Sequence, residues 1–281
     1  MVGYHGCSMA DQPLKERQER WRDEASFFDK TAAGIDLRPI DPLALARYRG
    51  PLRRRFNKEY RLLLLGDLRG KKVLDVGCGE GTNSILLAKL GAAVTGIDIS
   101  PKSIEIAGKR AEINQVDGSC RFVCSPLETA ELESHAFDII WADAILHHII
   151  PELPLVLGKL TQWAKPDALM VFSEPVNFNR TLRRIRFMIP VKTDVTPDER
   201  PLEFVEIVVL RRYIPDLRLR HFTLLGRLDR FFLVNCNYER PPWPRRAISN
   251  LCASIDSMAL SIPGIRRLSG TAVLYGHPEK G

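Results

Sequence analysis

The 281-residue sequence predicts an α/β fold with a doubly wound, mostly parallel sheet. Three observations favour this class: short apolar runs alternate with helical segments, a glycine cluster follows the first run, and an acidic residue ends the second. Strands that alternate with helices of this length imply parallel pairing, because a parallel crossover needs room for a helix. We expect seven strands in all, with an N-terminal helical lid before the first strand and a C-terminal helical insertion before the last one.

The residues ahead of the first expected strand are predicted to be mainly helical. Residues 13–30 predict an amphipathic helix, because aromatic and alanine side chains recur on one stripe. Residues 34–51 contain three prolines and two glycines without clear periodicity, which predicts a loop. Residues 52–66 predict a second helix that ends at the C-cap Gly66.

Apolar runs beyond residue 66 predict strands at 73–76, 93–98, 121–124, 137–141, 168–173, 217–225 and 271–275. Helical patterns between them predict helices at 82–90, at 152–164, at 202–214, and from Ser100 onward. Pro101 occupies the first position of that helix, where its missing N–H is tolerated. A long insertion separates the last two strands.

A glycine cluster follows the first strand in the segment Val73-Leu-Asp-Val-Gly-Cys-Gly-Glu-Gly81. Glycines let the backbone approach a ligand at the carboxyl edge of the sheet, where doubly wound folds bind their ligands. The G-x-G-x-G spacing differs from the G-x-G-x-x-G of dinucleotide sites. Asp98 ends the next strand, where its two oxygens can accept both hydroxyls of a ribose. The alternative interpretations are a tight turn in a non-catalytic domain and a helix cap.

The segments VLDVGCGEG and GIDIS resemble the first two motifs of class I S-adenosylmethionine-dependent methyltransferases. The similarity continues in family order through RFVCSPLE, FDIIWADAILHHI and AKPDALMVFSEP, over about residues 70–176. It implies S-adenosyl-L-methionine as cofactor and S-adenosyl-L-homocysteine as product. The residues that it implies at the cofactor site are Asp75, Gly77, Cys78, Gly79, Asp98, Ile99, Ser125, Pro126, Leu127, Ala142 and Asp143.

Within the cofactor, the resemblance assigns the first-motif residues to the methionine portion, Asp98 to the ribose and Ile99 to adenine. It also places the amide of Leu127 at the adenine edge, Ala142 near the sulfonium, and Asp143 within reach of the amino group. One position departs from the family pattern, because a proline stands where many relatives have an acidic residue for the adenine amine. That proline is Pro126, and Ser125, Glu128 or water are the substitutes we consider.

The acceptor side requires a base if the methyl acceptor is a hydroxyl or a protonated amine, whereas a thiolate needs none. His147 and His148 follow the fourth strand in a segment that resembles the acceptor-facing loop of small-molecule methyltransferases. Glu174 ends the fifth strand and is expected in the same region. His147 and Glu174 are the preferred catalytic residues, with a purely structural role as the alternative for each. No cluster of His, Cys and carboxylates has ligand spacing, so we expect no metal site.

These expectations divide the chain into four parts. Residues 1–66 form an N-terminal lid or cap segment, and 67–225 form an S-adenosylmethionine-binding, Rossmann-like core. Residues 226–269 form a substrate-cap insertion, and 270–281 form the final core strand and tail. The first helix resembles the lid helix of many relatives, and a helix that merely packs on the sheet is the alternative.

The composition is that of an ordinary globular protein, with 45% apolar and 27% charged residues, which argues against a disordered or fibrous chain. No uninterrupted run of 18 apolar residues and no signal-like N-terminal segment is present. The six cysteines form no C-x-x-C pair, so we expect free thiols and a cytoplasmic location.

The formal net charge of +7 reflects an arginine-rich C-terminal third, which suits an anionic partner but also an ordinary solvated surface. We predict a small-molecule acceptor that is methylated at oxygen. One form of this prediction is an anionic or lipid-like acceptor. The alternatives are nitrogen or sulfur methylation of a small molecule or lipid head group, RNA methylation, and a non-catalytic cofactor-binding subunit. Nucleic acid is the less favoured partner, because no RNA-binding module is visible. Residues 180–189 mix basic and apolar side chains as an interfacial helix would, and the commoner alternative is a helix packed on the core with an arginine outer face. We expect at most peripheral membrane contact.

Overall fold

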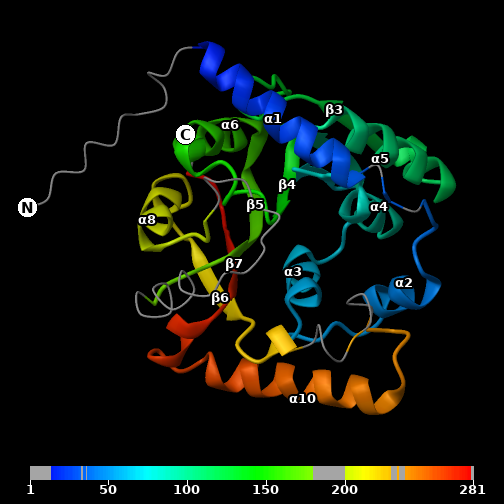
Figure 1. Ribbon diagram of the computed structural model, residues 1–281, viewed down its shortest axis with the longest axis vertical. Helices are drawn as coiled ribbons and strands as arrows, with labels where there is room; N and C mark the ends of the chain where they lie inside the picture. Colours follow the sequence, from blue (N-terminus) through cyan, green and yellow to red (C-terminus); the bar gives the residue numbers. More distant parts are fainter. Residues whose placement is uncertain are drawn as a thin grey trace, which may run out of the picture.

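A seven-stranded sheet in the order β3-β2-β1-β4-β5-β7-β6 lies at the centre of the computed structural model (Figure 1). Its strands are β1 (Lys72–Val76), β2 (Ala93–Asp98), β3 (Cys120–Cys124), β4 (Phe137–Asp143), β5 (Ala164–Pro175), β6 (Arg218–Phe222) and β7 (Thr271–Gly276). Strand β7 is antiparallel to β5 and β6, and the other neighbours pair in parallel. The predicted doubly wound, mostly parallel sheet is confirmed. The structure describes residues 14–32, 34–35, 37–179, 200–228, 233 and 238–279.

Helices cover both faces of this sheet. They are α1 (Leu14–Ala32), α2 (Pro42–Arg49), α3 (Asn57–Leu65), α4 (Thr82–Lys89), α5 (Pro101–Ile113), α6 (Leu153–Trp163), α8 (Phe204–Tyr213) and α10 (Trp243–Ala259). The apolar sides of α3 and α4 share one buried cluster, and those of α6 and α8 share the other. Strand β4 serves both clusters, since Ile139 and Trp141 face α3 and α4 whereas Ile140 and Ala142 face α6 and α8.

The prediction of a loop at residues 34–51 is wrong for the eight residues that form α2. Pro42 supplies a suitable first residue, and an oxygen of the Asp41 side chain accepts a hydrogen bond from the Leu43 amide at 3.0 Å. A cap and a proline therefore start a helix that has too weak an apolar periodicity to reveal itself. The next helix begins at Asn57 rather than at 52, but its C-cap is Gly66 as expected, with a φ of +65°.

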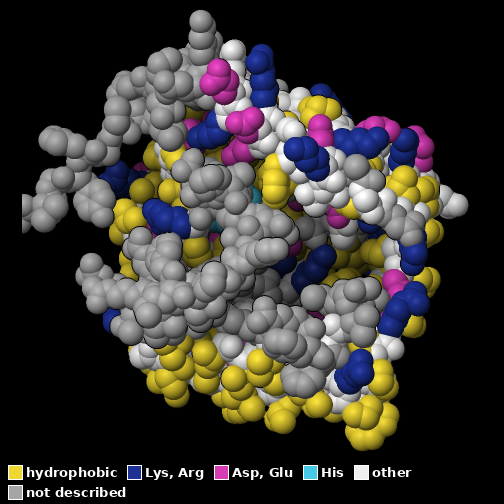
Figure 2. Space-filling model, in the orientation of Figure 1, with side chains coloured by type: hydrophobic (Ala, Val, Ile, Leu, Met, Phe, Trp, Pro, Cys, Tyr) yellow, Lys and Arg dark blue, Asp and Glu magenta, His cyan; other side chains and the backbone are white. Residues whose placement is uncertain are grey.

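The stretch from 226 to 269 contains α10 and two short 3₁₀ turns, Gly226–Leu228 and Ile265–Leu268. Asp256 attaches α10 to the first turn, because its buried carboxylate accepts hydrogen bonds from the amides of Leu224, Leu225 and Gly226 at 2.7–3.0 Å. Hydrophobic side chains gather along the lower edge of the molecule, over α10 (Figure 2). Within the described part of the chain, no helix combines the length and the apolar composition needed to cross a membrane.

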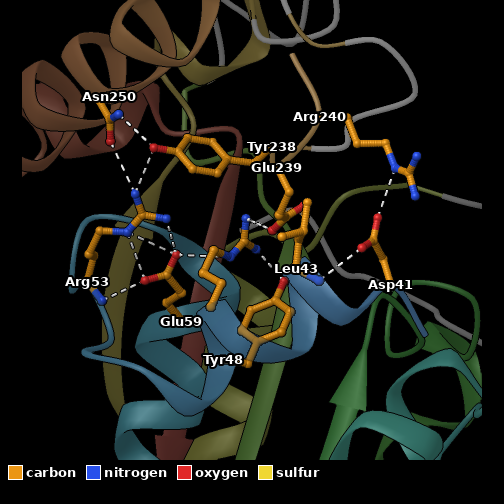
Figure 3. Close-up of polar contacts among 10 residues, drawn as sticks. Asp41, Leu43, Tyr48, Arg53, Glu59, Tyr238, Glu239, Arg240 and Asn250 are labelled. Atoms are coloured by element: carbon orange, nitrogen blue, oxygen red, sulfur yellow. Dashed lines mark hydrogen bonds and ion pairs between the residues drawn. The ribbon is translucent and has the colours of Figure 1, made fainter. Parts of the chain in front are cut away.

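A network of polar side chains fastens the segment before α10 to α2 and α3 (Figure 3). Arg53 forms an ion pair with Glu59 at 2.6 Å and donates to the Tyr238 hydroxyl at 2.9 Å. Tyr238 in turn accepts a hydrogen bond from Asn250 of α10 at 2.7 Å. The middle of α10 is thereby held against the N-terminal helices. The expected interfacial helix at 180–189 lies outside the described residues.

Replacing Leu157 by Ala is expected to lower the free energy of unfolding by about 3 kcal/mol, because this fully buried side chain of α6 would leave a cavity against the sheet. The matched control is Leu155→Ala, which truncates an exposed leucine two residues earlier on the same helix. Urea unfolding of both variants measures the difference. Equal losses would contradict the packing described for this face.

Candidate functional site

A cavity of about 300 Å³ lies beyond the carboxyl ends of β1, β2, β3 and β4. The loops that follow these strands form its walls, and the side chains of Glu24, Phe28 and Thr31 from α1 cover it. The expected cofactor residues that line it are Gly77, Gly79, Asp98, Ile99, Ser125, Pro126, Leu127 and Asp143. Asp75, Cys78 and Ala142 are instead buried behind the wall. One sheet edge therefore gathers residues that are up to 66 positions apart (143 − 77) in the sequence.

The glycine loop after β1 presents bare backbone to this cavity. Gly77 has a φ of +63°, and a Cβ there would lie 2.7 Å from the side chain of Ile145. Gly79 has a φ of +51° with nothing within 4 Å of its Cβ position, so a side chain would occupy ligand space rather than protein. Both conformations are ones that residues with a side chain rarely adopt. The loop is thus shaped to admit a ligand next to the main chain.

Asp98 joins this loop to the end of β2. One of its oxygens accepts a hydrogen bond from the Gly79 amide at 2.8 Å, and the other accepts one from the Ser100 amide at 2.9 Å. Burial in the cavity wall raises the pKa of the carboxyl, while these two amides oppose the shift. The carboxylate is therefore fixed in place and still faces the cavity.

Asp75 supports the glycine loop from behind. Its side chain is almost fully buried and accepts a hydrogen bond of 2.6 Å from the hydroxyl of Ser84. Burial raises the pKa of Asp75 to about 7, and the negative charges of Asp143 and Asp98 add to the increase. The carboxyl groups of Asp75, Asp98 and Asp143 thus lie close enough to influence one another's ionisation.

Asp143, at the end of β4, binds two residues that the sequence did not single out. It accepts a hydrogen bond from Arg61 of α3 at 3.0 Å and one from Asn83 of α4 at 3.1 Å. The Arg61 side chain is buried, and its Nε and Nη1 have no hydrogen-bond partner among the described residues. No motif marked this arginine, because only the packing of α3 against β4 brings it to the site. Arg61 is thus a buried cation that is linked to the cavity wall through Asp143.

Lys58, one turn of α3 before Arg61, lies in the same charged region. Desolvation lowers its pKa to about 8, and the nearby Arg61 and Arg47 guanidinium groups lower it further. The carboxylates of Asp143 and Asp75 act in the opposite direction. The site is therefore a mixed-charge region in which acids and bases from α3, β1 and β4 influence one another.

Glu174 lies beneath the loop that follows β4. It is fully buried, and one of its oxygens accepts hydrogen bonds from the amides of Ile145 and Leu146 at 3.0 and 2.9 Å. The other oxygen lies 2.9 Å from Nδ1 of His147. These contacts do not suit the expected role of Glu174 as a direct base, since both oxygens are committed to the protein. They suit a carboxylate that fixes the loop and orients His147.

The two adjacent histidines occupy different positions. The His147 ring is held by Glu174, whereas His148 lines the cavity and contacts the edge of Phe28 in α1. The two imidazole rings are in contact but tilted by 43° to each other, with centroids 4.1 Å apart. Through this contact, His147 and Glu174 are connected to the cavity wall.

Helix α1 is fastened over the cavity at both of its ends. Near its start, Arg20 pairs with Glu128 and Glu152 at 3.1 and 2.6 Å. Near its end, Asp29 accepts hydrogen bonds from the Ser100 hydroxyl and the Lys102 amide, at the beginning of α5. Glu128, one of the substitutes considered for the adenine amine, is thus already engaged by the covering helix. Helix α1 therefore covers this cavity.

Replacing Asp75 by Asn is expected to stabilise the ligand-free protein more at pH 8 than at pH 5. With a folded-state pKa of about 7 against an ordinary 3.8, the stabilising contribution of this carboxyl is complete below about pH 4 and is lost as the pH rises through about 7. The gain in the free energy of unfolding should grow by about 1 kcal/mol or more between the two pH values.

Urea unfolding at both pH values measures this gain. Asp117→Asn, in an exposed 3₁₀ turn, is the matched control. A gain that does not change with pH would contradict a protonated, buried carboxyl.

Comparison with known proteins identifies the domain. A family model described as a methyltransferase domain matches residues 67–196. The ubiquinone biosynthesis O-methyltransferase of Neisseria meningitidis serogroup C (strain 053442) is 38% identical over 149 residues, which are 52% of this chain and 56% of that protein. The chain therefore spans about half the length of the curated relatives that it matches.

Two solved structures show the same fold over nearly the whole chain. Geranyl diphosphate C-methyltransferase from Streptomyces coelicolor A3(2) matches with a TM-score of 0.51 and 14% identity, over 92% of this chain and 97% of that one. The [4+2]-cyclase SpnF matches with a TM-score of 0.52 and 20% identity, over 90% and 97%. Residues 67–196 therefore match the methyltransferase domain family, and the chain has the fold of the class I S-adenosylmethionine-dependent methyltransferases.

Proposed function

We propose that this protein transfers a methyl group from S-adenosyl-L-methionine to an oxygen atom of a small-molecule acceptor. The observation that carries the proposal is the contact of 2.9 Å between His147 and the buried Glu174, next to a cavity whose walls suit the cofactor. A hydroxyl acceptor must lose a proton, and an oriented imidazole is suited to take it. The relatives named as O-methyltransferases support oxygen as the acceptor atom.

The cavity walls suit the separate parts of the cofactor. The bare backbone at Gly77 and Gly79 leaves space for the methionine portion, and Asp98 faces the cavity where a ribose can donate both hydroxyls. Ile99 and Leu127 supply the apolar surface for adenine. S-adenosylmethionine carries positive charge on its sulfonium and amino groups, which complements the carboxylates at this edge.

The unpartnered nitrogens of Arg61 complete this match. The cofactor also carries a carboxylate, and a buried guanidinium with two free N–H directions is a suitable donor to it. Asp143 accepts a hydrogen bond from Arg61 at 3.0 Å and itself lines the cavity. Arg61 is therefore connected to the ligand cavity through Asp143. Asp143 is then shared between Arg61 and the amino group of the ligand.

The bound cofactor supplies an electrophilic methyl group, so the protein has to hold the acceptor in line and remove one proton. Glu174 accepts the Nδ1–H of His147, which leaves Nε2 to accept the proton of the acceptor hydroxyl. The carboxylate then stabilises the imidazolium that forms, as in other His–carboxylate pairs. In this scheme His147 is the base and Glu174 is a positioning residue.

The N-terminal and C-terminal segments frame the site. We assign α1 as the cover of the cofactor, because Glu24, Phe28 and Thr31 line the cavity from its open side. We also propose that the chain is divided into the four parts given above. In that division, residues 226–269 form the cap over the acceptor.

Asp98→Ala is expected to weaken S-adenosylmethionine binding by about tenfold or more, because the ribose hydroxyls lose a charged acceptor. Isothermal titration with S-adenosylmethionine and with S-adenosylhomocysteine measures the effect. Asp167→Ala, at an exposed position in β5, is the control. Unchanged affinity for both ligands would remove Asp98 from the cofactor site.

His147→Ala is expected to lower kcat by about 100-fold without changing cofactor affinity, because it removes the general base. Glu174→Gln should lower kcat less and should shift the pH dependence of kcat/KM, since the imidazole loses its charged partner. Turnover is measured with catechol-type and aliphatic hydroxyl acceptors, and His277→Ala at an exposed position is the control. Normal turnover of both variants would place the base elsewhere.

A further inference from the structure

We propose that the outer face of α10, together with the arginines at its two ends, docks on the surface of an anionic phospholipid bilayer. This interaction surface is defined by the apolar side chains Trp243, Ile248, Leu251, Ile255, Met258 and Ile262. It lies apart from the cofactor cavity, and its assignment does not depend on the proposed methyl transfer.

The apolar side chains of this face follow the helical repeat but point away from the protein. From Ile248 to Met258 they recur at spacings of three and four, which places them on one side of the helix, and Ile262 follows in the turn after its end. Trp243, Leu251 and Met258 are 73%, 61% and 67% exposed, and the row is visible over α10 in Figure 2. A helix that faced only water would carry its polar residues on that side, so the apolar row has the character of an interaction surface.

The charges around the row have one sign. Between Pro241 and Leu268 the only acidic residue is Asp256, and it is buried against the amides of the preceding turn. Arg245 and Arg246 stand at the start of α10, and a second arginine pair, 266–267, stands just beyond its end. An apolar row between cationic ends is the pattern of a helix that lies in the headgroup region of an anionic membrane.

A second observation extends the cationic surface at the C-terminal end of the row. A cavity of about 430 Å³ between α8 and β6 is lined by Arg211, Arg218, Arg266 and Arg267, and none of the described residues in its wall is acidic. None of these four arginines forms an ion pair with another residue of the described chain. Arg266 and Arg267 belong to both features, so phosphate groups of lipids next to the helix can pair with this cavity.

A second copy of the chain is a poorer occupant of this face. If two α10 helices packed antiparallel, the arginines at the start of one would meet those beyond the end of the other. If they packed in parallel, each pair would meet itself. Either arrangement brings like charges together around an apolar contact, whereas anionic headgroups neutralise both ends.

The fold keeps the row exposed and in one orientation. The network of Arg53, Tyr238 and Asn250 fastens the middle of α10 (Figure 3), and Asp256 fastens its C-terminal part. With 17 residues and polar side chains on its inner side, α10 is suited to lie along a membrane surface rather than to cross it.

The test is co-sedimentation of the full chain with phosphatidylcholine vesicles and with vesicles that contain phosphatidylglycerol and phosphatidylcholine in a 1:3 ratio. We expect binding to the anionic vesicles, weakening as the salt concentration rises, and little binding to the neutral ones. The double variant Leu251→Ser/Met258→Ser should lose affinity for the anionic vesicles by at least about tenfold. The double variant Arg266→Ser/Arg267→Ser should show a loss of the same size. The matched control, Leu155→Ser on α6, exchanges an exposed apolar residue elsewhere and should bind as the natural sequence does.

Trp243 gives an independent measurement, because insertion into the headgroup region shifts its fluorescence to shorter wavelength. The shift should appear with anionic vesicles and disappear in Trp243→Phe. Absence of vesicle binding, or binding that Leu251→Ser/Met258→Ser leaves unchanged, would overturn the proposal. Dimerisation in solution that this double variant abolishes would also overturn it, by assigning the face to a second copy.

Discussion

The parallel pairing of β1 with both β2 and β4 is the constraint on which the rest of the structure depends. Val76 pairs with Ile97 on one side and with Ala142 on the other, so the three strands end at the same level. The glycine loop, Asp98 and Asp143 consequently meet at one edge of the sheet. Every other component of the site, from the covering helix to the histidine loop, is arranged around that meeting point.

Charge balance is the second principle that organises the site. Asp75, Asp98 and Asp143 approach one another because of the strand register, and the elevated pKa of Asp75 reflects this proximity as well as burial. Arg61 offsets part of the negative charge and keeps two nitrogens unpartnered within the described chain. A ligand that carries positive groups and a carboxylate can pair with the aspartates and with Arg61 at the same time. This is the physical reason that S-adenosylmethionine, which carries charges of both signs, suits this pocket.

The two ends of the chain use amphipathic helices in opposite ways. Helix α1 turns Phe28 toward the cavity and is tied down through Arg20 and Asp29, so its apolar side is covered by the protein. Helix α10 is tied down through the buried Asp256 and turns its apolar row outward. The same sequence pattern thus closes a cavity in one place and leaves an exposed apolar surface in the other, because the anchoring polar residue lies on the inner side of α10.

The sequence by itself determined the sheet, the order of most elements and the glycine and Asp98 end of the cavity, because short apolar runs and local G-x-G-x-G spacing depend only on neighbouring residues. It missed α2, whose start rests on a cap rather than on periodicity. Tertiary structure alone decided that Arg61 reaches Asp143, that Glu174 is buried beneath the histidine loop, and that the row on α10 faces outward. These contacts join segments 27 to 82 residues apart or depend on which side of a helix is buried, and no local pattern encodes either property.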